Sequence, residues 1–153
     1  MGYIIKQDEV FMMQIYSISY ACDHFEELRL EALKGKEIFV EDDEQNGSPL
    51  ISIIPTELLD SLTEIFIFVP HWEEDNSIYT VSTNVIDVIG YGNTRDEAAE
   101  VLAIAAMEYA RLYFLQIDYY RSPLVNRGLH YPYLRRIARC NDNIALVKHV
   151  LGV

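Results

Sequence analysis

The first third of the chain alternates hydrophobic and polar positions in a way that predicts a strand followed by a helix. Residues 14–20 place apolar and polar side chains in turn, which is the pattern of a half-buried strand. Asp23 is predicted as the N-cap of the following helix, because Glu26 stands three residues on and completes a capping box. Gly35 stands where a helix commonly ends in a left-handed residue.

Two short apolar segments come next and predict a hairpin-like pair of strands. Residues 37–41 and 50–54 flank a polar connection at 42–49. Because this connection is longer than a two-residue turn, we expect a loose loop. Pro55 ends the second strand, and residues 56–62 are predicted as a short helix. The pattern therefore predicts a compact β-α-β-β-α unit.

A second run of apolar segments predicts three more strands. They cover residues 65–72, 78–83 and 85–90, with a polar turn at 73–77. A long helical pattern follows, with mostly apolar side chains at three- and four-residue steps. Three strands and one long helix are enough for a small α+β layer. The predicted buried stripe of this helix consists of Ala98, Leu102, Ala105, Tyr109, Leu112 and Gln116.

The glycine-containing segment before this helix, Gly90 to Gly92, has two interpretations. A phosphate-binding loop needs a third glycine or a following Gly-Lys-Ser/Thr sequence, and neither is present. Thr94 and Glu97 instead form a capping box, in which a hydroxyl and a carboxylate satisfy the first free backbone donors of the helix. We therefore expect the turn between a strand and a helix.

The aromatic residues between 109 and 120 also have two interpretations. They could form a stacking platform for nucleic acid, or they could belong to the core or to an oligomer contact. A stacking platform needs a cationic groove beside it. The acidic surroundings of this segment therefore favour the core or an oligomer contact.

The end of the chain changes in character. Residues 122–133 contain two prolines and one glycine and predict an extended arm, and residues 134–141 and 142–152 predict two short helices. A basic cluster lies on the first of these helices. It would either fold back onto the acidic body or a neighbouring subunit, or contact RNA, DNA or an acidic partner; three arginines are few for phosphate binding, which favours the first interpretation. The cluster consists of Arg135, Arg136 and Arg139.

Charge is distributed unevenly along the 153 residues. Residues 1–120 carry six Lys/Arg and 23 Asp/Glu, a net charge of −17, whereas residues 121–153 carry six Lys/Arg and one Asp, a net charge of +5. An acidic body argues against broad binding to nucleic acid or anionic membranes, because phosphate contacts need a surplus of Lys and Arg. Half of the residues are hydrophobic, which is typical of a globular protein.

The residues that could bind a metal or catalyse a reaction are scattered along the sequence. Cys22 and Cys140 lie far apart and the histidines have no partner at metal-ligand spacing, so we expect no metal site and no cofactor. No nucleophile elbow or phosphate loop is present. Asp87 is the only acid within the predicted strands of 78–90, and one carboxylate does not make the two-metal site of an RNase-H-like nuclease. We therefore predict a protein that is not an enzyme.

Residues 1–13 have no clear period and are predicted to be a leader, in which Met12 and Met13 leave the translation start open. No signal peptide opens the chain, and no apolar run reaches the roughly 18 residues that span a bilayer. Together with the isolated cysteines, this predicts a cytoplasmic protein without a membrane association.

The first predicted unit resembles the N-terminal module of the Phd/YefM antitoxins over about residues 14–63. The resemblance rests on a pattern of residue classes, found here at 35–40, 47–49, 51–55 and 57–62. It implies a dimerising module that binds operator DNA through its N-terminal part. The turn at 41–49 is acidic here, where the family usually has a basic turn, which argues against DNA on charge. The implied DNA-binding positions are Ser17, Ser19 and Arg29.

The second predicted unit resembles the HicB-like antitoxins, a partly RNase-H-like β-β-β-α arrangement, over about residues 65–120. The resemblance rests on the strand at 79–82 and on the helix start at 92–98, which is similar to the family's Gly-Asp-Thr-x-x-Glu-Ala. The family's Pro-Asp-Leu-Pro-Gly segment is replaced by residues 84–87. The implied fold class is α+β, with a Phd/YefM-like β-α-β-β-α module, a HicB-like β-β-β-α module and a helical basic tail.

The predicted organisation is therefore a leader at 1–13, a dimerisation module at 14–63, a HicB-like module at 64–120 and a basic arm at 121–153. The two resemblances imply a non-enzymatic antitoxin of a toxin–antitoxin system that binds a toxin and could regulate its own operon. The alternative is a structural or scaffolding oligomer without toxin or DNA binding. In both cases we expect a homodimer or higher oligomer, since small sheets expose edges that are usually paired.

Overall fold

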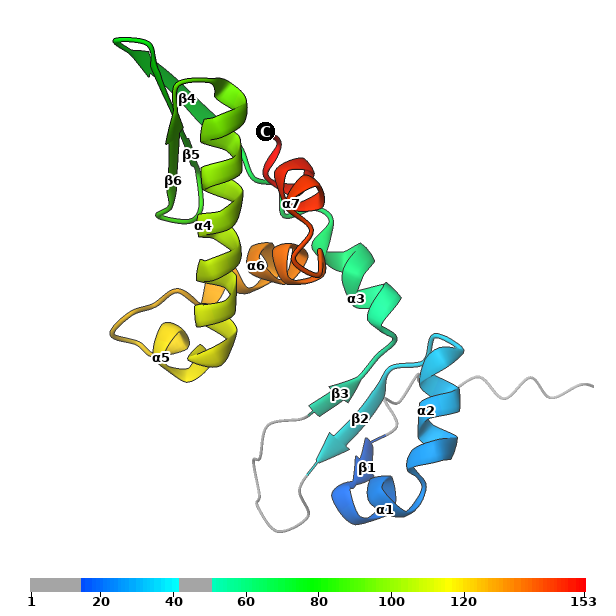
Figure 1. Ribbon diagram of the computed structural model, residues 1–153. Helices are drawn as coiled ribbons and strands as arrows, with labels where there is room; N and C mark the ends of the chain where they lie inside the picture. The colour runs from blue at the N-terminus through cyan, green and yellow to red at the C-terminus, as the bar shows by residue number, and fades with distance from the viewer. Residues whose placement is uncertain (1–14, 42–50) are drawn as a thin grey trace, which may run out of the picture. The chain divides into compact units, whose positions relative to one another are not determined.

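The structure is a computed structural model, and it describes residues 15–41 and 51–153. It has the predicted α+β fold class, with two separate three-stranded sheets and several helices (Figure 1). The chain divides into two compact units, Met1–Leu59 and Asp60–Val153. The predicted leader at 1–13, the beginning of the first strand at residue 14 and the predicted loop at 42–49 lie outside the described residues.

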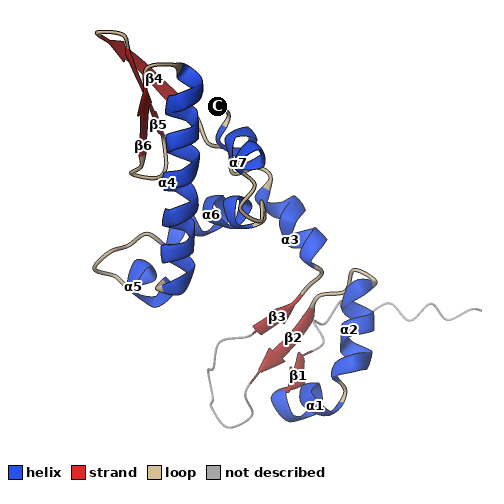
Figure 2. Cartoon of the chain, in the orientation of Figure 1, coloured by secondary structure: helices blue, strands red, loops and turns tan. Residues whose placement is uncertain are grey.

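Unit 1 contains a three-stranded sheet and short helices (Figure 2). The sheet order is β1-β2-β3. Strands β1 and β2 are parallel, and Tyr16 pairs with Val40; strands β2 and β3 are antiparallel, and Val40 pairs with Ile51. The last helix, α3, crosses the boundary between the units. The elements are β1 (Ile15–Ser17), α1 (Ile18–Asp23), α2 (Phe25–Leu33), β2 (Ile38–Glu41), β3 (Ile51–Ile53) and α3 (Thr56–Thr63).

The prediction of a strand over 14–20 is wrong beyond Ser17. The hydroxyl of Ser17 accepts a hydrogen bond from the backbone N–H of Tyr20 at 3.1 Å and so caps α1. The ring of Tyr20 then stacks on that of His24, at 4.0 Å between centroids. The predicted N-cap at Asp23 is also wrong, because Asp23 is the last residue of α1 and His24 precedes α2. Gly35, with φ of +93°, follows the helix as predicted.

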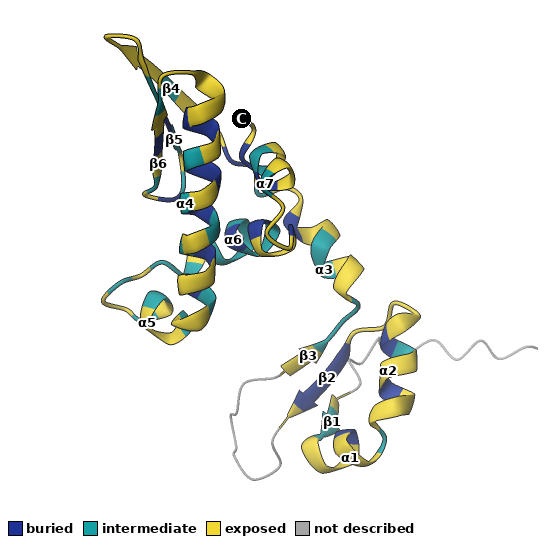
Figure 3. Ribbon diagram, viewed as in Figure 1, coloured by how far each residue is buried: buried dark blue, intermediate teal, exposed yellow. Residues whose placement is uncertain are grey.

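The core of unit 1 is small. One face of the sheet packs on α1 and α2 through buried Ala21, Leu28, Ala32, Ile38 and Val40, with Tyr16 and Ile53 against them. Many residues of the same unit are exposed (Figure 3), and large apolar side chains are among them. Those at least two-fifths exposed are Ile15, Ile18, Tyr20, Phe25, Leu30, Leu33, Ile51 and Leu58. Among its described residues, this unit therefore leaves exposed more large apolar side chains than it buries.

Unit 2 is built on a meander of order β4-β5-β6. One long helix, α4, lies between this sheet and the helices α6 and α7 (Figure 1). The elements are β4 (Pro70–Asp75), β5 (Ile78–Thr83), β6 (Ile89–Gly92), α4 (Arg95–Leu115), α5 (Ile117–Arg121), the 3-10 helix η1 (Gly128–His130), α6 (Tyr131–Ala138) and α7 (Ile144–Leu151).

Several strands begin or end at other residues than predicted, although β5 matches the predicted strand at 78–83. The predicted strand at 65–72 is wrong before Pro70, because the segment before it has no strand partner among the described residues. Instead, the rings of Phe66 and Phe68 pack edge-on against that of Tyr133, with 5.4 and 5.2 Å between ring centroids. The predicted turn at 73–77 shrinks to Asn76 and Ser77, which both have positive φ. The third strand begins only at Ile89, four residues later than predicted.

Gly90 and Gly92 belong to β6 and lie against the start of α4 rather than in a turn. A Cβ atom on Gly90 would lie 2.0 Å from the carbonyl oxygen of Ala98, and one on Gly92 would lie 2.5 Å from Cβ of Glu97. The capping box is confirmed: the hydroxyl of Thr94 accepts from the N–H of Glu97 at 3.2 Å, and the carboxylate of Glu97 accepts from the N–H of Asn93 at 2.8 Å. The glycines therefore serve close packing of strand and helix.

The buried surface of α4 differs from the predicted stripe. Leu112 and Gln116 are exposed, whereas Ala103, Ala106 and Ala110 are buried. The reason is that α4 is covered from two sides, and alanines allow the neighbouring elements to approach closely. The buried residues of the helix are Ala98, Ala99, Leu102, Ala103, Ala106, Ala110 and Tyr113.

The predicted extended arm at 122–133 is wrong, since this segment folds back onto α4. The hydroxyl of Tyr113 donates to the carbonyl oxygen of Arg127 at 3.1 Å, and Tyr109 is hydrogen-bonded to His130 at 2.8 Å. Helix α6 then starts at Tyr131 and closes the core together with α7. The aromatic residues of α4 thus act in the core, as one of the two interpretations expected. Tyr113 is fully buried.

Candidate interaction surfaces

The predicted DNA-binding residues do not form a cationic site. Ser17 is the N-cap of α1, and Ser19 is exposed in the first turn of that helix. Arg29 lies on α2, where its guanidinium donates to both carboxylate oxygens of Glu26 at 2.6 and 3.0 Å. This pair lowers the pKa of Glu26, mainly through the hydrogen bond from Arg29. The positive charge of Arg29 is therefore already compensated.

The other cations of unit 1 within the described residues are also paired. Lys34 is 2.7 Å from one carboxylate oxygen of Glu31, and Lys36 binds the other. Hydrogen bonds from these two lysines lower the pKa of Glu31 to about 2. Residues 15–59 hold three Lys/Arg and ten Asp/Glu, a net charge of −7. Phosphate-driven affinity requires the opposite balance.

The basic cluster of the tail surrounds one carboxylate. Arg135 and Arg139, on and just beyond α6, form ion pairs with opposite oxygens of Asp60, the second at 3.1 Å. The hydrogen bond from Arg135 is the main reason that the pKa of Asp60 is lowered. Arg136 donates to the carbonyl oxygen of Phe66 at 2.6 Å. All three guanidinium groups thus hold the start of unit 2 to α6, and their use by a partner or nucleic acid stays a prediction.

A second polar cluster connects the segment after α5 to the loop between β5 and β6. Arg127 donates to the carboxylate of Asp87 at 2.7 Å and to the hydroxyl of Tyr109 at 3.2 Å. That hydroxyl also contacts Nδ1 of His130. Burial is the main reason that the pKa of His130 is lowered. Asp87, the carboxylate considered for a nuclease, is therefore engaged in an ion pair. Sequence reasoning missed this cluster, because its members are up to 43 residues apart.

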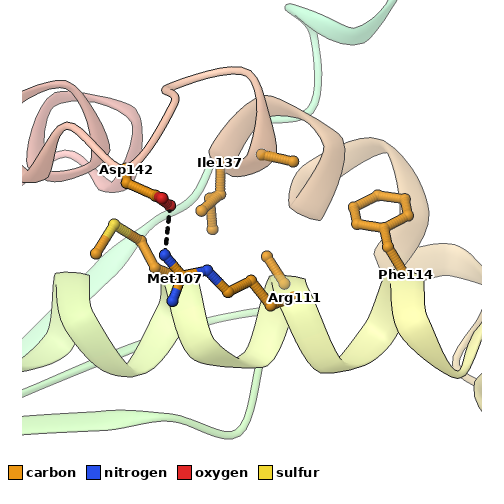
Figure 4. Close-up of a pocket in the computed structure, with 7 residues that line it drawn as sticks. Met107, Arg111, Phe114, Ile137 and Asp142 are labelled. Carbon is orange, nitrogen blue, oxygen red and sulfur yellow. Dashed lines mark ion pairs between the residues drawn. The ribbon is translucent and has the colours of Figure 1, made fainter.

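A cavity of about 310 Å³ lies between α4 and α6 (Figure 4). Arg111 and Asp142 form an ion pair of 2.8 Å beside it, and both side chains are more than half exposed. The remaining lining is apolar, so the cavity has no free polar group to orient a small ligand. It is lined by Met107, Ala110, Arg111, Phe114, Ile137, Ala138 and Asp142.

Within the described ranges, 15–41 and 51–153, no group of three or more His, Cys, Asp or Glu side chains is placed to hold a metal ion. No helix of these ranges is both long and apolar enough to cross a membrane. Cys22 is exposed and Cys140 is buried, and both are free thiols.

Comparisons with known proteins bear on the fold and the family. A solved structure from Syntrophomonas wolfei subsp. wolfei, described as an antitoxin part of a candidate toxin/antitoxin system, matches with a TM-score of 0.76 and 21% identity. The match covers 90% of this chain and 96% of that chain, and at this identity it shows the fold alone. No curated protein matches.

Residues 12–152 match the model of the PHD_like family, described as "Antitoxin of toxin-antitoxin, RelE / RelB, TA system". The match includes residues of both units and ends at the residue that follows α7. Because it spans far more than half of the sequence, the chain belongs to this antitoxin family.

Proposed function

We propose that this chain is a non-enzymatic antitoxin that neutralises a toxin protein by stoichiometric binding. The observation that carries the proposal is the family match over residues 12–152. The charge of the chain supports a protein ligand, since the formal net charge is −12 and an acidic surface attracts a basic protein. The proposal places the protein in the cytoplasm, where the toxin would be made.

The proposal includes the predicted organisation, with a Phd/YefM-like module at 14–63, a HicB-like module at 64–120 and a basic tail at 121–153. Its support is the order of elements: β1 to α3 for the first module, and β4, β5, β6 and α4 for the second. In this organisation the tail is a structural part of the second module, because α6 and α7 supply Leu134, Val147 and Leu151 to its core.

The first module is the proposed site of self-association. Its core is small, and its surface carries the large apolar side chains named above. Small domains with so little buried apolar area are commonly stabilised by oligomerisation. We expect a homodimer whose contact covers part of this surface.

Operator DNA is the less supported ligand, although repression of the chain's own operon belongs to the functions implied by the resemblance. The three cations of unit 1 within the described residues are paired with carboxylates. Of the tail arginines, two share the carboxylate of Asp60. DNA binding through these cations would therefore require their ion pairs to be exchanged, and it would be strongly weakened by salt.

Co-expression tests the proposed function directly. The reading frame beside the gene is induced alone and together with this full-length chain, and growth is followed. Arrest by the neighbouring product, relief by this chain and co-elution of the two proteins in a fixed ratio are the expected results. A neighbouring product that is harmless, or that arrests growth equally with and without this chain, would contradict the proposal and favour the scaffolding alternative.

Binding of DNA is measured separately, by titrating salt into a mixture of the full-length chain and its upstream DNA. Specific binding that persists at physiological salt and weakens in Arg29→Ala would establish operator recognition by unit 1. Glu27→Ala on the same helix is the matched control, because Glu27 is exposed and carries the opposite charge.

A further inference from the structure

The sheet of unit 2 has one face packed against α4 and one open face (Figure 1). Trp72, Val81 and Gly90 pair across the three strands in one row, and Val81 and Gly90 are buried on the α4 side. Side chains of neighbouring residues in a strand point to opposite faces. The open face therefore consists of His71, Glu73, Asp75, Ile78, Thr80, Ser82, Ile89 and Tyr91.

The open face is arranged in rows of distinct chemistry. One row runs from Glu73 on β4 through Thr80 to Tyr91 on β6, and the next runs from His71 through Ser82 to Ile89. Acids thus gather on β4 and apolar side chains on β6. Tyr91 is 66% exposed and Ile89 is 56% exposed, so the apolar side is accessible to a partner. An aromatic and an aliphatic anchor beside a charged rim form the usual anatomy of a protein contact.

The charge of this sheet is entirely negative. Residues 70–92 contain four acids, at 73, 74, 75 and 87, and no Lys or Arg. Asp87 is paired with Arg127, whereas the three acids of β4 form no ion pair with the described residues. Two of these acids, Glu73 and Asp75, share the open face with exposed Ile89 and Tyr91.

Three kinds of partner for this face can be compared by their charge: nucleic acid, a second copy of this chain and a basic protein. Nucleic acid is repelled, since its phosphates need cations that residues 70–92 lack. A second copy in a twofold contact presents the same face, and its acidic strand would have to meet either acids or the apolar strand. A partner with Lys or Arg around a small apolar centre matches both halves of the surface.

We propose that the open face of the β4-β5-β6 sheet is the surface on which this antitoxin docks its toxin, through a basic, partly apolar patch of that toxin. The inference rests on the proposed function and assigns it to a surface. Tyr91 and Ile89 anchor the contact, and Glu73 and Asp75 provide its charged rim. Unit 1 is then free for self-association while unit 2 holds the toxin.

The test uses the full-length chain and the purified product of the neighbouring reading frame, with the dissociation constant measured by biolayer interferometry. Two double variants alter the open face: Ile89→Thr with Tyr91→Thr, which keep strand propensity, and Glu73→Lys with Asp75→Lys. We expect each to weaken binding at least about tenfold, as hot-spot truncations do. The charge reversal should also reduce the salt dependence of the association rate.

Matched controls lie on the exposed side of α4. Leu112→Gln with Leu115→Gln removes two exposed apolar side chains, and Glu100→Lys with Glu108→Lys reverses two exposed acids. These variants should bind within about threefold of the wild type, because surface residues outside a contact contribute little to affinity. Thermal unfolding shows whether each variant is folded, and light scattering measures its oligomer mass.

The possible outcomes distinguish a failure of the proposed docking surface from a failure of the proposed antitoxin function. Wild-type binding that the open-face variants retain would overturn the docking surface and leave the antitoxin function standing. A wild-type chain that does not bind the neighbouring product would remove both. A change of oligomer mass in the open-face variants, with toxin binding unchanged, would assign the face to a second copy of this chain and overturn the proposal.

Discussion

The two units of this chain use their hydrophobic residues differently. In unit 2 a long alanine-rich helix is covered by a sheet and by two helices, and Tyr113, Leu102 and Leu134 are fully buried. In unit 1 the buried face consists mainly of small or β-branched side chains, while Phe25, Leu33 and other large ones are exposed. Unit 2 thus has the larger buried core, and the exposed apolar side chains of unit 1 support its proposed self-association.

The largest effect is expected from a cavity in the core of unit 2. Leu102→Ala should lower the free energy of unfolding by about 2 to 5 kcal/mol, because Leu102 is fully buried and its neighbours cannot fill the space. Urea unfolding followed by Trp72, the only tryptophan, reports on this unit. Ile104→Ala, at an exposed position of the same helix, should cost much less. Equal losses for the two variants would mean that α4 is not the centre of the core.

The next effect is expected at the contact of β6 with α4. Gly90→Ala places a Cβ atom against the backbone of Ala98 and Leu102, which cannot move independently of the helix. We expect a loss of about 1 to 3 kcal/mol or more, as for other overpacked sites. Gly128→Ala is the control, since a Cβ atom there meets nothing within 4 Å. The two melting temperatures compare the variants, and a stable Gly90→Ala protein would refute close packing at this point.

Protein concentration should distinguish unit 1 from unit 2. If unit 1 is completed by a homodimer, each tenfold increase in concentration stabilises it by about 1.4 kcal/mol per mole of dimer, or about 0.7 kcal/mol per protomer. Hydrogen exchange of β2 amides, measured at two concentrations, should follow this increase, whereas amides of β5 should change less. Leu33→Gln, at a 58% exposed position, should weaken the dimer in light scattering. Equal exchange of β2 at both concentrations would contradict an associated unit 1.

The smallest effect concerns pH. Burial and nearby Arg127 lower the pKa of His130, against the opposing influence of Asp87. Below the ordinary value of about 6.5 the unfolded chain takes up a proton before the folded one, so stability should fall as the pH decreases through this value. Because His130 is only partly buried, we expect a few tenths of a kcal/mol.

Unfolding of His130→Asn between pH 7.5 and 5 measures this contribution. The variant should have a flatter pH profile than the wild type, because asparagine does not titrate there. His149→Asn, at an exposed position of α7, provides the control and should retain the wild-type slope. A steeper profile in the His130 variant would mean that the imidazolium is favoured in the folded state.

Locally determined features were predictable from the sequence. The capping box of Thr94 and Glu97 formed as expected, because its partners are three residues apart. The strand at 78–83 was also correct, since its alternation is matched by a partner on each side. The predicted strand at 65–69 was wrong, because periodicity cannot tell a strand from an extended segment whose side chains, such as Phe66 and Phe68, pack against a helix residue.

In the candidate sites, too, features formed by nearby residues were predicted and contacts between distant residues were not. Arg135, Arg136 and Arg139 were recognised as a cluster because they lie close together in the sequence. Asp60, the partner of Arg135 and Arg139, could not be recognised, since 75 residues separate it from Arg135. The predicted arm likewise looked extended because of its prolines and glycine, while the hydroxyls of Tyr109 and Tyr113 that hold it lie on another element.

The α+β class, the acidic balance, the capped long helix and the residue patterns that indicate an antitoxin could be predicted, because composition, local hydrogen bonds and short-range periodicity are properties of contiguous residues. The neutralised charges and the open face of the β4-β5-β6 sheet could be identified only from the fold. Those properties depend on which distant segments pack together, and packing is a property of the whole unit.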